Sequence, residues 1–106
     1  MFQSIILIPS YNEKKSLKNI LNKINSKFKV IVIDDCSDDG TCQYLKKKKI
    51  EFIKNKTNIG YESTLKKGMI YIKKNYKKCN TVITFDADGE HKVSDLKKLS
   101  NFQKKN

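Results

Sequence analysis

Two aspartates that stand two residues apart, Asp86 and Asp88, have the spacing in this chain that most directly suggests chemistry. They follow an apolar run at residues 81–85, so they leave a predicted strand together. Carboxylate oxygens placed in this way can reach one hard cation, such as Mg²⁺ or Mn²⁺, and leave coordination positions open for phosphate oxygens. Asp-x-Asp alone is a weak signal, because surface carboxylates are common at this spacing.

The remaining carboxylates are also clustered. Most of the 11 acidic residues fall into three short groups, which are Glu13; Asp34, Asp35, Asp38 and Asp39; and Asp86, Asp88 and Glu90. The chain is otherwise rich in lysine and carries a formal net charge of +12. This concentration of acidic residues predicts that the three groups meet at one cation.

The elements that must position these groups begin with short apolar runs rich in β-branched residues. Such runs predict strands buried on both faces, as in a parallel sheet. Three of them lie at residues 4–8, 30–33 and 81–85, and a weaker run at residues 51–53 predicts a fourth strand. Each acidic group follows or ends one of the three stronger runs.

Helices are predicted between these runs. Apolar residues repeat with the helical period in residues 17–24 and 65–76, and shorter helices are predicted at residues 41–47 and 93–102. This alternation predicts a single α/β domain over residues 1–106, with a Rossmann-like open, mostly parallel sheet and helices on both faces. In such sheets ligands bind beyond the carboxyl ends of the strands, where the acidic groups are expected.

Two other classes of protein with acidic motifs fit this chain poorly. A calcium loop beginning at Asp86 would need glycine at His91 and glutamate at Lys97. One beginning at Asp35 would meet Lys46 where the bidentate glutamate belongs. A phosphatase-like hydrolase with an aspartate nucleophile remains an alternative, although its similar Phe-Asp-x-Asp-Gly motif ends the first strand and not the fourth.

Four segments resemble, in order, the signatures of family 2 glycosyltransferases. They are ILIPSYNE at residues 6–13, VIDDCSDDGT at 32–41, NIG at 58–60 followed by Gly68, and DADGEH at 86–91. The resemblance covers nearly the whole chain and is nearest to the polyprenyl-phosphate (dolichol-phosphate-like) sugar synthases. It implies the nucleotide-sugar-binding N-terminal half of a GT-A fold.

The resemblance also implies roles for individual residues on the nucleoside side. Pro9, Tyr11 and Glu13 are expected to line the nucleoside pocket. Asp35 is expected to hydrogen-bond the base, and Ala87 to pack beside the ribose and diphosphate. An aromatic ring that stacks on a base and a carboxylate that accepts from a base N–H agree with these roles, because a fixed acceptor leaves the wrong base unpaired.

On the diphosphate side, the resemblance implies that Asp86 and Asp88 hold Mg²⁺ or Mn²⁺ as part of the nucleotide-sugar site. Glu90 stands where relatives place another polar ligand, so a third metal contact is expected there. The chain departs from its relatives just after the NIG segment. There it has Tyr61 and Glu62, whereas relatives commonly have small residues.

The reaction implied is the metal-dependent transfer of a sugar, with inversion, from a UDP- or GDP-type nucleotide sugar. The acceptor is expected to be a polyprenyl phosphate or a glycan. The catalytic base of the family, an acidic residue in a later segment, has no counterpart here and is expected beyond Asn106. The chain is therefore predicted to be a truncated domain that binds donor but contains no catalytic base of its own.

Charge suggests a different alternative, a basic module that binds nucleic acid or an anionic membrane on an α/β scaffold. The chain has 23 basic residues, all of them lysine. The absence of arginine disfavours bidentate readout of bases and phosphates, so no nucleic-acid partner is expected. Peripheral association with a membrane is compatible with this charge.

Cysteine content and hydropathy bear on the compartment. Cys36, Cys42 and Cys79 are odd in number and share the chain with a single histidine, which supports neither a disulfide framework nor a zinc site. No apolar run approaches the roughly 18 residues of a membrane span, and the N-terminus lacks the features of a secretory signal. A cytoplasmic protein, or one at the cytoplasmic face of a membrane, is expected.

Overall fold

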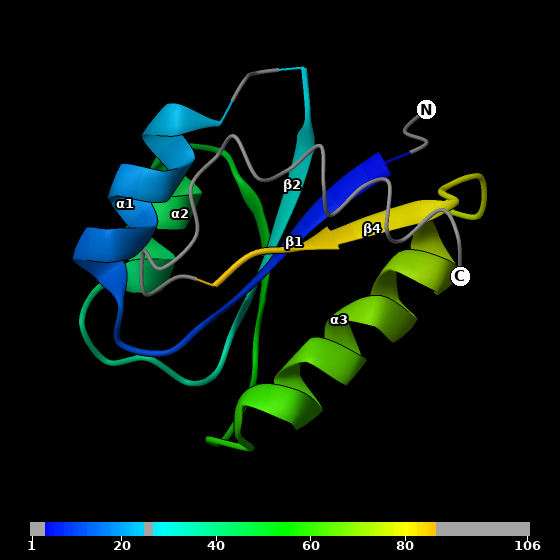
Figure 1. The fold of residues 1–106 in the computed structure, drawn as a ribbon. Helices are drawn as coiled ribbons and strands as arrows, with labels where there is room; N and C mark the ends of the chain where they lie inside the picture. Colours follow the sequence, from blue (N-terminus) through cyan, green and yellow to red (C-terminus); the bar gives the residue numbers. More distant parts are fainter. Residues whose placement is uncertain (1–3, 25–26, 87–106) are drawn as a thin grey trace.

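Strands and helices alternate along the chain as the sequence predicts (Figure 1). The computed structural model describes residues 4–24 and 27–86. Its elements are β1 (Ser4–Ser10), α1 (Lys14–Lys23), β2 (Lys29–Asp34), α2 (Thr41–Lys47), β3 (Glu51–Lys54), α3 (Tyr61–Asn75) and β4 (Thr81–Thr84). The helix predicted at residues 93–102 lies outside the described residues.

The strands form one parallel sheet in the order β3-β2-β1-β4. Ser10 pairs with Asp34 and Asp34 with Lys54, so the carboxyl ends of three strands are level at one edge of the sheet. β1 continues through Pro9, which has no N–H to donate. Proline is tolerated at this position because the pairing of β1 with β4 has already ended at Leu7, opposite Thr84.

Helices cover both faces of the sheet, which confirms the predicted layering (Figure 1). Ile6 and Ile8 of β1 pack on one face with Leu17 of α1 and Leu45 of α2. The alternate residues of β1 pack on the other face with Ile72 of α3. Side chains of a strand alternate between faces, so burial on both sides explains why these strands are continuously apolar.

Gly68 allows α3 to lie close against the sheet. A Cβ atom at this position would lie 2.6 Å from Leu7 Cδ1 and 2.8 Å from Ile33 Cγ1, distances too short for carbon atoms. The absent side chain therefore sets the distance between α3 and the strands, and so the position of the N-terminal end of α3 beside the sheet edge. None of the described helices is long and apolar enough to cross a membrane.

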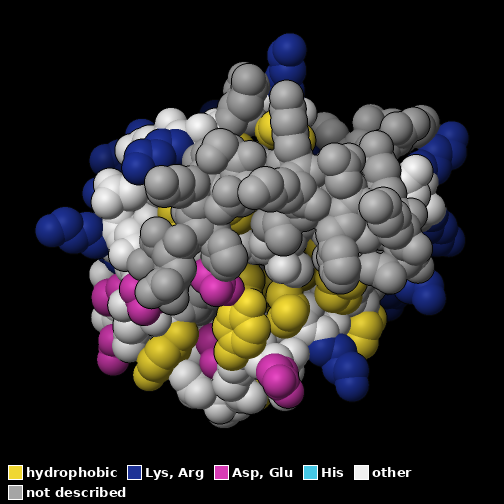
Figure 2. Space-filling model, viewed as in Figure 1, with side chains coloured by type: hydrophobic (Ala, Val, Ile, Leu, Met, Phe, Trp, Pro, Cys, Tyr) yellow, Lys and Arg dark blue, Asp and Glu magenta, His cyan; other side chains and the backbone are white. Residues whose placement is uncertain are grey.

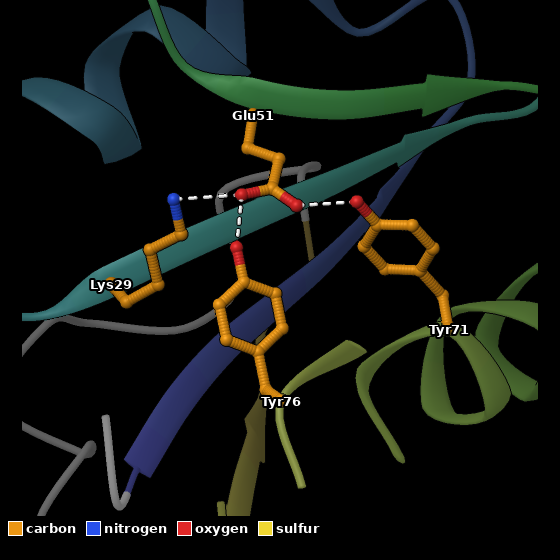
Figure 3. A network of polar contacts seen from close by, with 4 residues as sticks. All are labelled: Lys29, Glu51, Tyr71 and Tyr76. Atoms are coloured by element: carbon orange, nitrogen blue, oxygen red, sulfur yellow. Dashed lines mark hydrogen bonds and ion pairs between the residues drawn. The ribbon is translucent and has the colours of Figure 1, made fainter. Parts of the chain in front are cut away.

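A polar network joins α3 to the opposite edge of the sheet, where the strands begin (Figure 3). Glu51 of β3 forms an ion pair with Lys29 of β2 at 2.8 Å, and its carboxylate accepts hydrogen bonds from the hydroxyls of Tyr71 and Tyr76. Burial alone would raise the pKa of Glu51, but Lys29 and the two hydroxyls lower it below its ordinary value of 4.5. The hydrogen bond to Glu51 and burial raise the pKa of Tyr71 to about 12.

Replacing this carboxylate is expected to cost stability in a way that depends on pH. Because the pKa of Glu51 is depressed in the folded chain, its ionised form stabilises the fold above pH 4.5, and this contribution is lost as the pH falls further. Glu51→Gln should therefore lower the free energy of unfolding by about 1 kcal/mol at pH 7. In urea titrations the difference from wild type should shrink towards pH 3.

The exposed Glu62 in the first turn of α3 provides the control. Glu62→Gln should change stability by about 0.5 kcal/mol or less at either pH. A Glu51→Gln chain as stable as wild type at pH 7 would show that the network contributes nothing net.

Candidate functional site

A cavity of about 640 Å³ lies at the carboxyl edge of the sheet, on the side covered by α3. It is bounded by the ends of β1, β2 and β4, by the loop after β1 and by the first turn of α3. Its lining consists of Pro9, Ser10, Tyr11, Glu13, Asp35, Asn58, Gly60, Tyr61, Thr64 and Asp86. In Figure 2, acidic and apolar side chains lie side by side on the lower part of the visible face, and the lysines seen in this view lie around its margins.

This cavity brings together five of the residues that the sequence analysis assigns to a nucleotide sugar. Pro9, Tyr11, Glu13, Asp35 and Asp86 come from three separate segments and all line this one cavity. The others, which are Ala87, Asp88 and the third expected metal contact Glu90, lie outside the described residues. Parallel strands bring these segments together because their carboxyl ends meet at one edge.

Asp35 is the most strongly held of these carboxylates. Its side chain is 4% exposed, and it accepts hydrogen bonds from Asn55 Nδ2 (3.0 Å), the Ile59 N–H (2.8 Å) and the Gly60 N–H (2.9 Å). Burial alone would raise its pKa, but these donors and Thr64 lower it below the ordinary value of 3.8. Asp35 therefore remains ionised and anchors the loop that leads into α3.

These contacts restrict what Asp35 can offer a ligand. A carboxylate has about four acceptor positions, and the protein itself occupies at least three of them. A bound base would therefore have to share Asp35 with the loop that it anchors.

The expectation that all three acidic groups meet at one cation is wrong for Asp34 and Asp39. Asp34 is fully buried and accepts hydrogen bonds from the N–H (2.8 Å) and Oγ (2.6 Å) of Ser37. Asp39 accepts from the Lys14 N–H (3.1 Å) and the Thr41 N–H (3.1 Å), so it joins the start of α1 to the start of α2. Neither lines the cavity. Asp34 and Asp35 leave the end of β2 on opposite faces of the sheet, because successive side chains of a strand alternate.

The loops that follow β1 and β2 are joined by their own polar contacts. Asn12 adopts a left-handed backbone conformation with a φ of 50°, which asparagine tolerates better than most residues. Its N–H donates to Ser37 Oγ (2.8 Å), and its Oδ1 accepts from the Asp38 N–H (2.9 Å). These bonds hold the loop that carries Tyr11 and Glu13 beside the end of β2.

One contact of the site is not foreseen by the sequence. The hydroxyl of Tyr61, at the start of α3, donates to Asp86 Oδ1 at 2.8 Å. Tyr61 and Tyr11 both line the cavity, and they are 53% and 47% exposed. The only sequence signal is that Tyr61 directly follows the NIG segment, where the resemblance leads us to expect a small residue.

The carboxylate of Asp86 is a suitable ligand for a hard divalent cation. It places carboxylate oxygen, the ligand that Mg²⁺ and Mn²⁺ prefer, at the end of β4 on the cavity. Within residues 4–24 and 27–86, no group of three histidine, cysteine or acidic side chains is placed to hold a metal ion by itself. Any such ion at Asp86 would need ligands from elsewhere, and Asp88, Glu90 and a bound phosphate are the expected sources.

The charges of the side chains that line the cavity also favour a bound cation. Glu13, Asp35 and Asp86 supply three carboxylates, and none of the described residues that line the cavity is a lysine. A diphosphate would be repelled by this lining unless a cation bridged the two. The cavity is therefore suited to an apolar or aromatic group together with a cation-bound anion.

The family model described as "Glycosyl transferase family 2" matches residues 5–106 of the chain. A relative from Methanococcus voltae, UDP-N-acetylglucosamine–dolichyl-phosphate N-acetylglucosaminyltransferase, is 32% identical over 114 residues. The match covers 89% of this chain and 44% of the relative, so the chain spans less than half of that protein.

Solved structures share the fold. The structure of S. aureus TarS residues 1–349 superposes with a TM-score of 0.69 and 26% identity, covering 95% of this chain and 32% of that chain. A mannosyltransferase from Pyrobaculum calidifontis, PcManGT in complex with GDP-Man and Mn²⁺, gives a TM-score of 0.69 at 18% identity. It covers 95% of this chain and 31% of that chain.

Proposed function

Because the chain belongs to glycosyl transferase family 2, we propose that it forms the donor-binding part of an inverting, metal-dependent glycosyltransferase. The observation that carries this proposal is the cavity at the carboxyl edge of the sheet. It gathers Pro9, Tyr11, Glu13, Asp35 and Asp86, the described residues to which the family signatures assign the nucleotide sugar. The GT-A glycosyltransferases that superpose on the chain share its parallel sheet.

In this proposal the nucleoside occupies the part of the cavity between the loop after β1 and the end of β2. The exposed ring of Tyr11 stacks on the base, and Pro9 and Glu13 complete the wall. Asp35 accepts from a base N–H with the acceptor capacity that its internal hydrogen bonds leave. Because its pKa is lowered, it stays an acceptor across the physiological range.

The diphosphate is then directed towards the end of β4. Asp86, Asp88 and Glu90 would hold Mg²⁺ or Mn²⁺, and the bound cation would neutralise negative charge on the leaving diphosphate. The carboxylates of the chain orient the cation-bound diphosphate, and they repel a diphosphate that has no bound cation. A base on the opposite face of the sugar, contributed by a later segment, would activate the acceptor hydroxyl.

The donor is proposed to be a UDP- or GDP-type nucleotide sugar and the acceptor a polyprenyl phosphate or a glycan. The relative from Methanococcus voltae carries UDP-N-acetylglucosamine and dolichyl phosphate in its name, and the superposed mannosyltransferase was solved with GDP-Man and Mn²⁺. A lipid-linked acceptor would place the protein at the cytoplasmic face of a membrane, in keeping with its lysine-rich surface.

Isothermal titration with a panel of nucleoside diphosphates in the presence of Mn²⁺ tests this proposal. One base should bind at least about tenfold more tightly than the others, because a fixed acceptor leaves wrong bases unpaired. Tyr11→Ala should weaken binding by roughly tenfold or more, since base–aromatic stacking is worth about 1–3 kcal/mol.

The matched control is Phe28→Ala, which removes an exposed aromatic ring that does not line the cavity. It should leave nucleotide affinity unchanged. A chain that binds no nucleotide, but binds DNA or anionic vesicles equally well with and without Asp86→Ala, would favour a basic binding module instead.

A further inference from the structure

Tyr61 joins two carboxylates of the site through a short segment of chain. Its hydroxyl donates to Asp86 Oδ1 at 2.8 Å, so it holds one carboxylate oxygen of the residue that stands two positions after β4. The two residues before it, Ile59 and Gly60, donate their N–H groups to Asp35. The end of β2 and the end of β4 are therefore connected by polar contacts from consecutive residues.

Several hydrogen bonds and a glycine with positive φ fix the backbone around this connection. Gly60 has a φ of 93°, in the left-handed region that favours glycine, and it directly precedes α3. Asn55 stands at the other end of the loop, where its N–H donates to the Asp34 carbonyl (2.7 Å) and its side chain donates to Asp35 and to Thr64 Oγ1 (3.1 Å). Both ends of residues 55–61 are thus fixed before any ligand binds.

We propose that Tyr61 is a positioning residue: its hydroxyl holds the carboxylate of Asp86 in the orientation in which it binds the cation, and residues 55–61 link that orientation to Asp35. This inference rests on the proposed function, because it concerns the cation that Asp86 is proposed to hold. It adds a residue that lies outside the four segments by which the chain resembles the family.

The physical reason lies in the geometry of carboxylate ligands. An exposed carboxylate just beyond a strand can rotate about its side-chain bonds. Binding a cation fixes these bonds, and the loss of conformational entropy weakens the binding. A hydrogen bond from a neighbouring group to the ligand fixes it in advance, and loss of such a bond typically lowers metal affinity by about 10- to 100-fold. The tyrosine ring spans from α3 to β4, which a small side chain at this position cannot do.

The experiment compares wild type with Tyr61→Phe, which keeps the ring in the cavity wall and removes only the hydroxyl. Mn²⁺ binding is measured by electron paramagnetic resonance with saturating UDP or GDP, whichever the chain binds. Mn²⁺ affinity should fall by about tenfold in Tyr61→Phe. Affinity for the corresponding nucleoside, which has no phosphate, should change less than about twofold in EDTA, because the hydroxyl does not contact the base.

Tyr71→Phe is the matched control. It also removes a tyrosine hydroxyl that donates to a carboxylate, in this case Glu51 at the opposite edge of the sheet. It should leave Mn²⁺ affinity unchanged even if it lowers stability.

Three results would overturn the positioning role of Tyr61. The first is wild-type Mn²⁺ affinity in Tyr61→Phe. The second is an equal loss in Tyr71→Phe, which would indicate a general effect on the fold. The third is an equal loss of nucleoside and Mn²⁺ affinity, which would make Tyr61 a wall of the base pocket. A different result would refute the proposed cation site itself. The wild-type chain would then bind the nucleoside, and it would bind the nucleoside diphosphate equally well with and without Mn²⁺, so that Tyr61 would have no cation ligand to position.

Discussion

Asp35→Ala should lower the free energy of unfolding by about 3 kcal/mol or more and abolish nucleotide binding. Asp35 is 4% exposed and accepts hydrogen bonds from Asn55, Ile59 and Gly60. Each bond to a charged acceptor contributes about 1.5–3 kcal/mol, and removing the acceptor leaves donors without a partner. The loop before α3 would lose its anchor, and the cavity would lose one wall.

Asp35→Asn separates the two effects. Asparagine retains one acceptor oxygen but turns an NH₂ group towards donors, so an intermediate loss of stability is expected. Nucleotide binding should weaken by roughly 1.5–3 kcal/mol, while its dependence on the metal persists, because Asp35 is assigned to the base and not to the phosphates. Binding of a nucleotide panel identical to that of wild type would refute this assignment.

Urea denaturation measures the stability change, with Asp38→Ala as control. Asp38 is an exposed aspartate in the loop between β2 and α2, which also contains Asp35, and it does not line the cavity. Its replacement should therefore lower the free energy of unfolding by about 0.5 kcal/mol or less. The effect of Asp35 should also depend on pH. Its pKa is depressed from 3.8 in the folded chain, so its contribution is present above that pH and is lost as the pH falls below it.

A nucleoside diphosphate should stabilise the chain against heat only when Mn²⁺ or Mg²⁺ is present. The cavity carries three carboxylates and no lysine among its described lining residues, so a free diphosphate meets only repulsion. With the cation, nucleotide at 100 times its Kd should add about 2.7 kcal/mol to the free energy of unfolding. For a domain of this size that corresponds to a rise in Tm of roughly 10 °C or more.

Differential scanning fluorimetry with and without EDTA measures this rise. Asp86→Ala should remove the metal-dependent part, whereas Asp38→Asn should retain it, because Asp38 does not line the cavity. Equal stabilisation in EDTA would show that no cation bridges the diphosphate and the carboxylates. The metal-dependent half of the proposed function would then have to be abandoned.

The sequence alone determined the architecture of this chain, because its signals are local. The β-branched runs at residues 4–8, 30–33 and 81–85 predict three of the observed strands, since residues buried on both faces must be continuously apolar, and the weaker run at residues 51–53 predicts the partly exposed β3. The helix predicted at residues 41–47 has the observed bounds of α2. That the described signature residues, Pro9, Tyr11, Glu13, Asp35 and Asp86, lie at one edge also follows from the sequence, because parallel strands end together.

Only the tertiary structure decided which acidic residues face the cavity. Asp34 and Asp35 are neighbours with the same side chain, yet one is enclosed by Ser37 and the other lines the site. Their roles differ because adjacent strand residues point to opposite faces, and the face is set by where α3 packs. Asp35 in turn is held by donors 20 to 25 residues away.

The contact between Tyr61 and Asp86 was decided in the same way. It joins residues 25 positions apart in the sequence, and it requires that the first turn of α3 stand beside the end of β4. That position depends on Gly68, whose missing side chain lets α3 approach Leu7 and Ile33. Local periodicity predicts that α3 is a helix, but the depth at which it packs depends on contacts between distant segments, which no local pattern encodes.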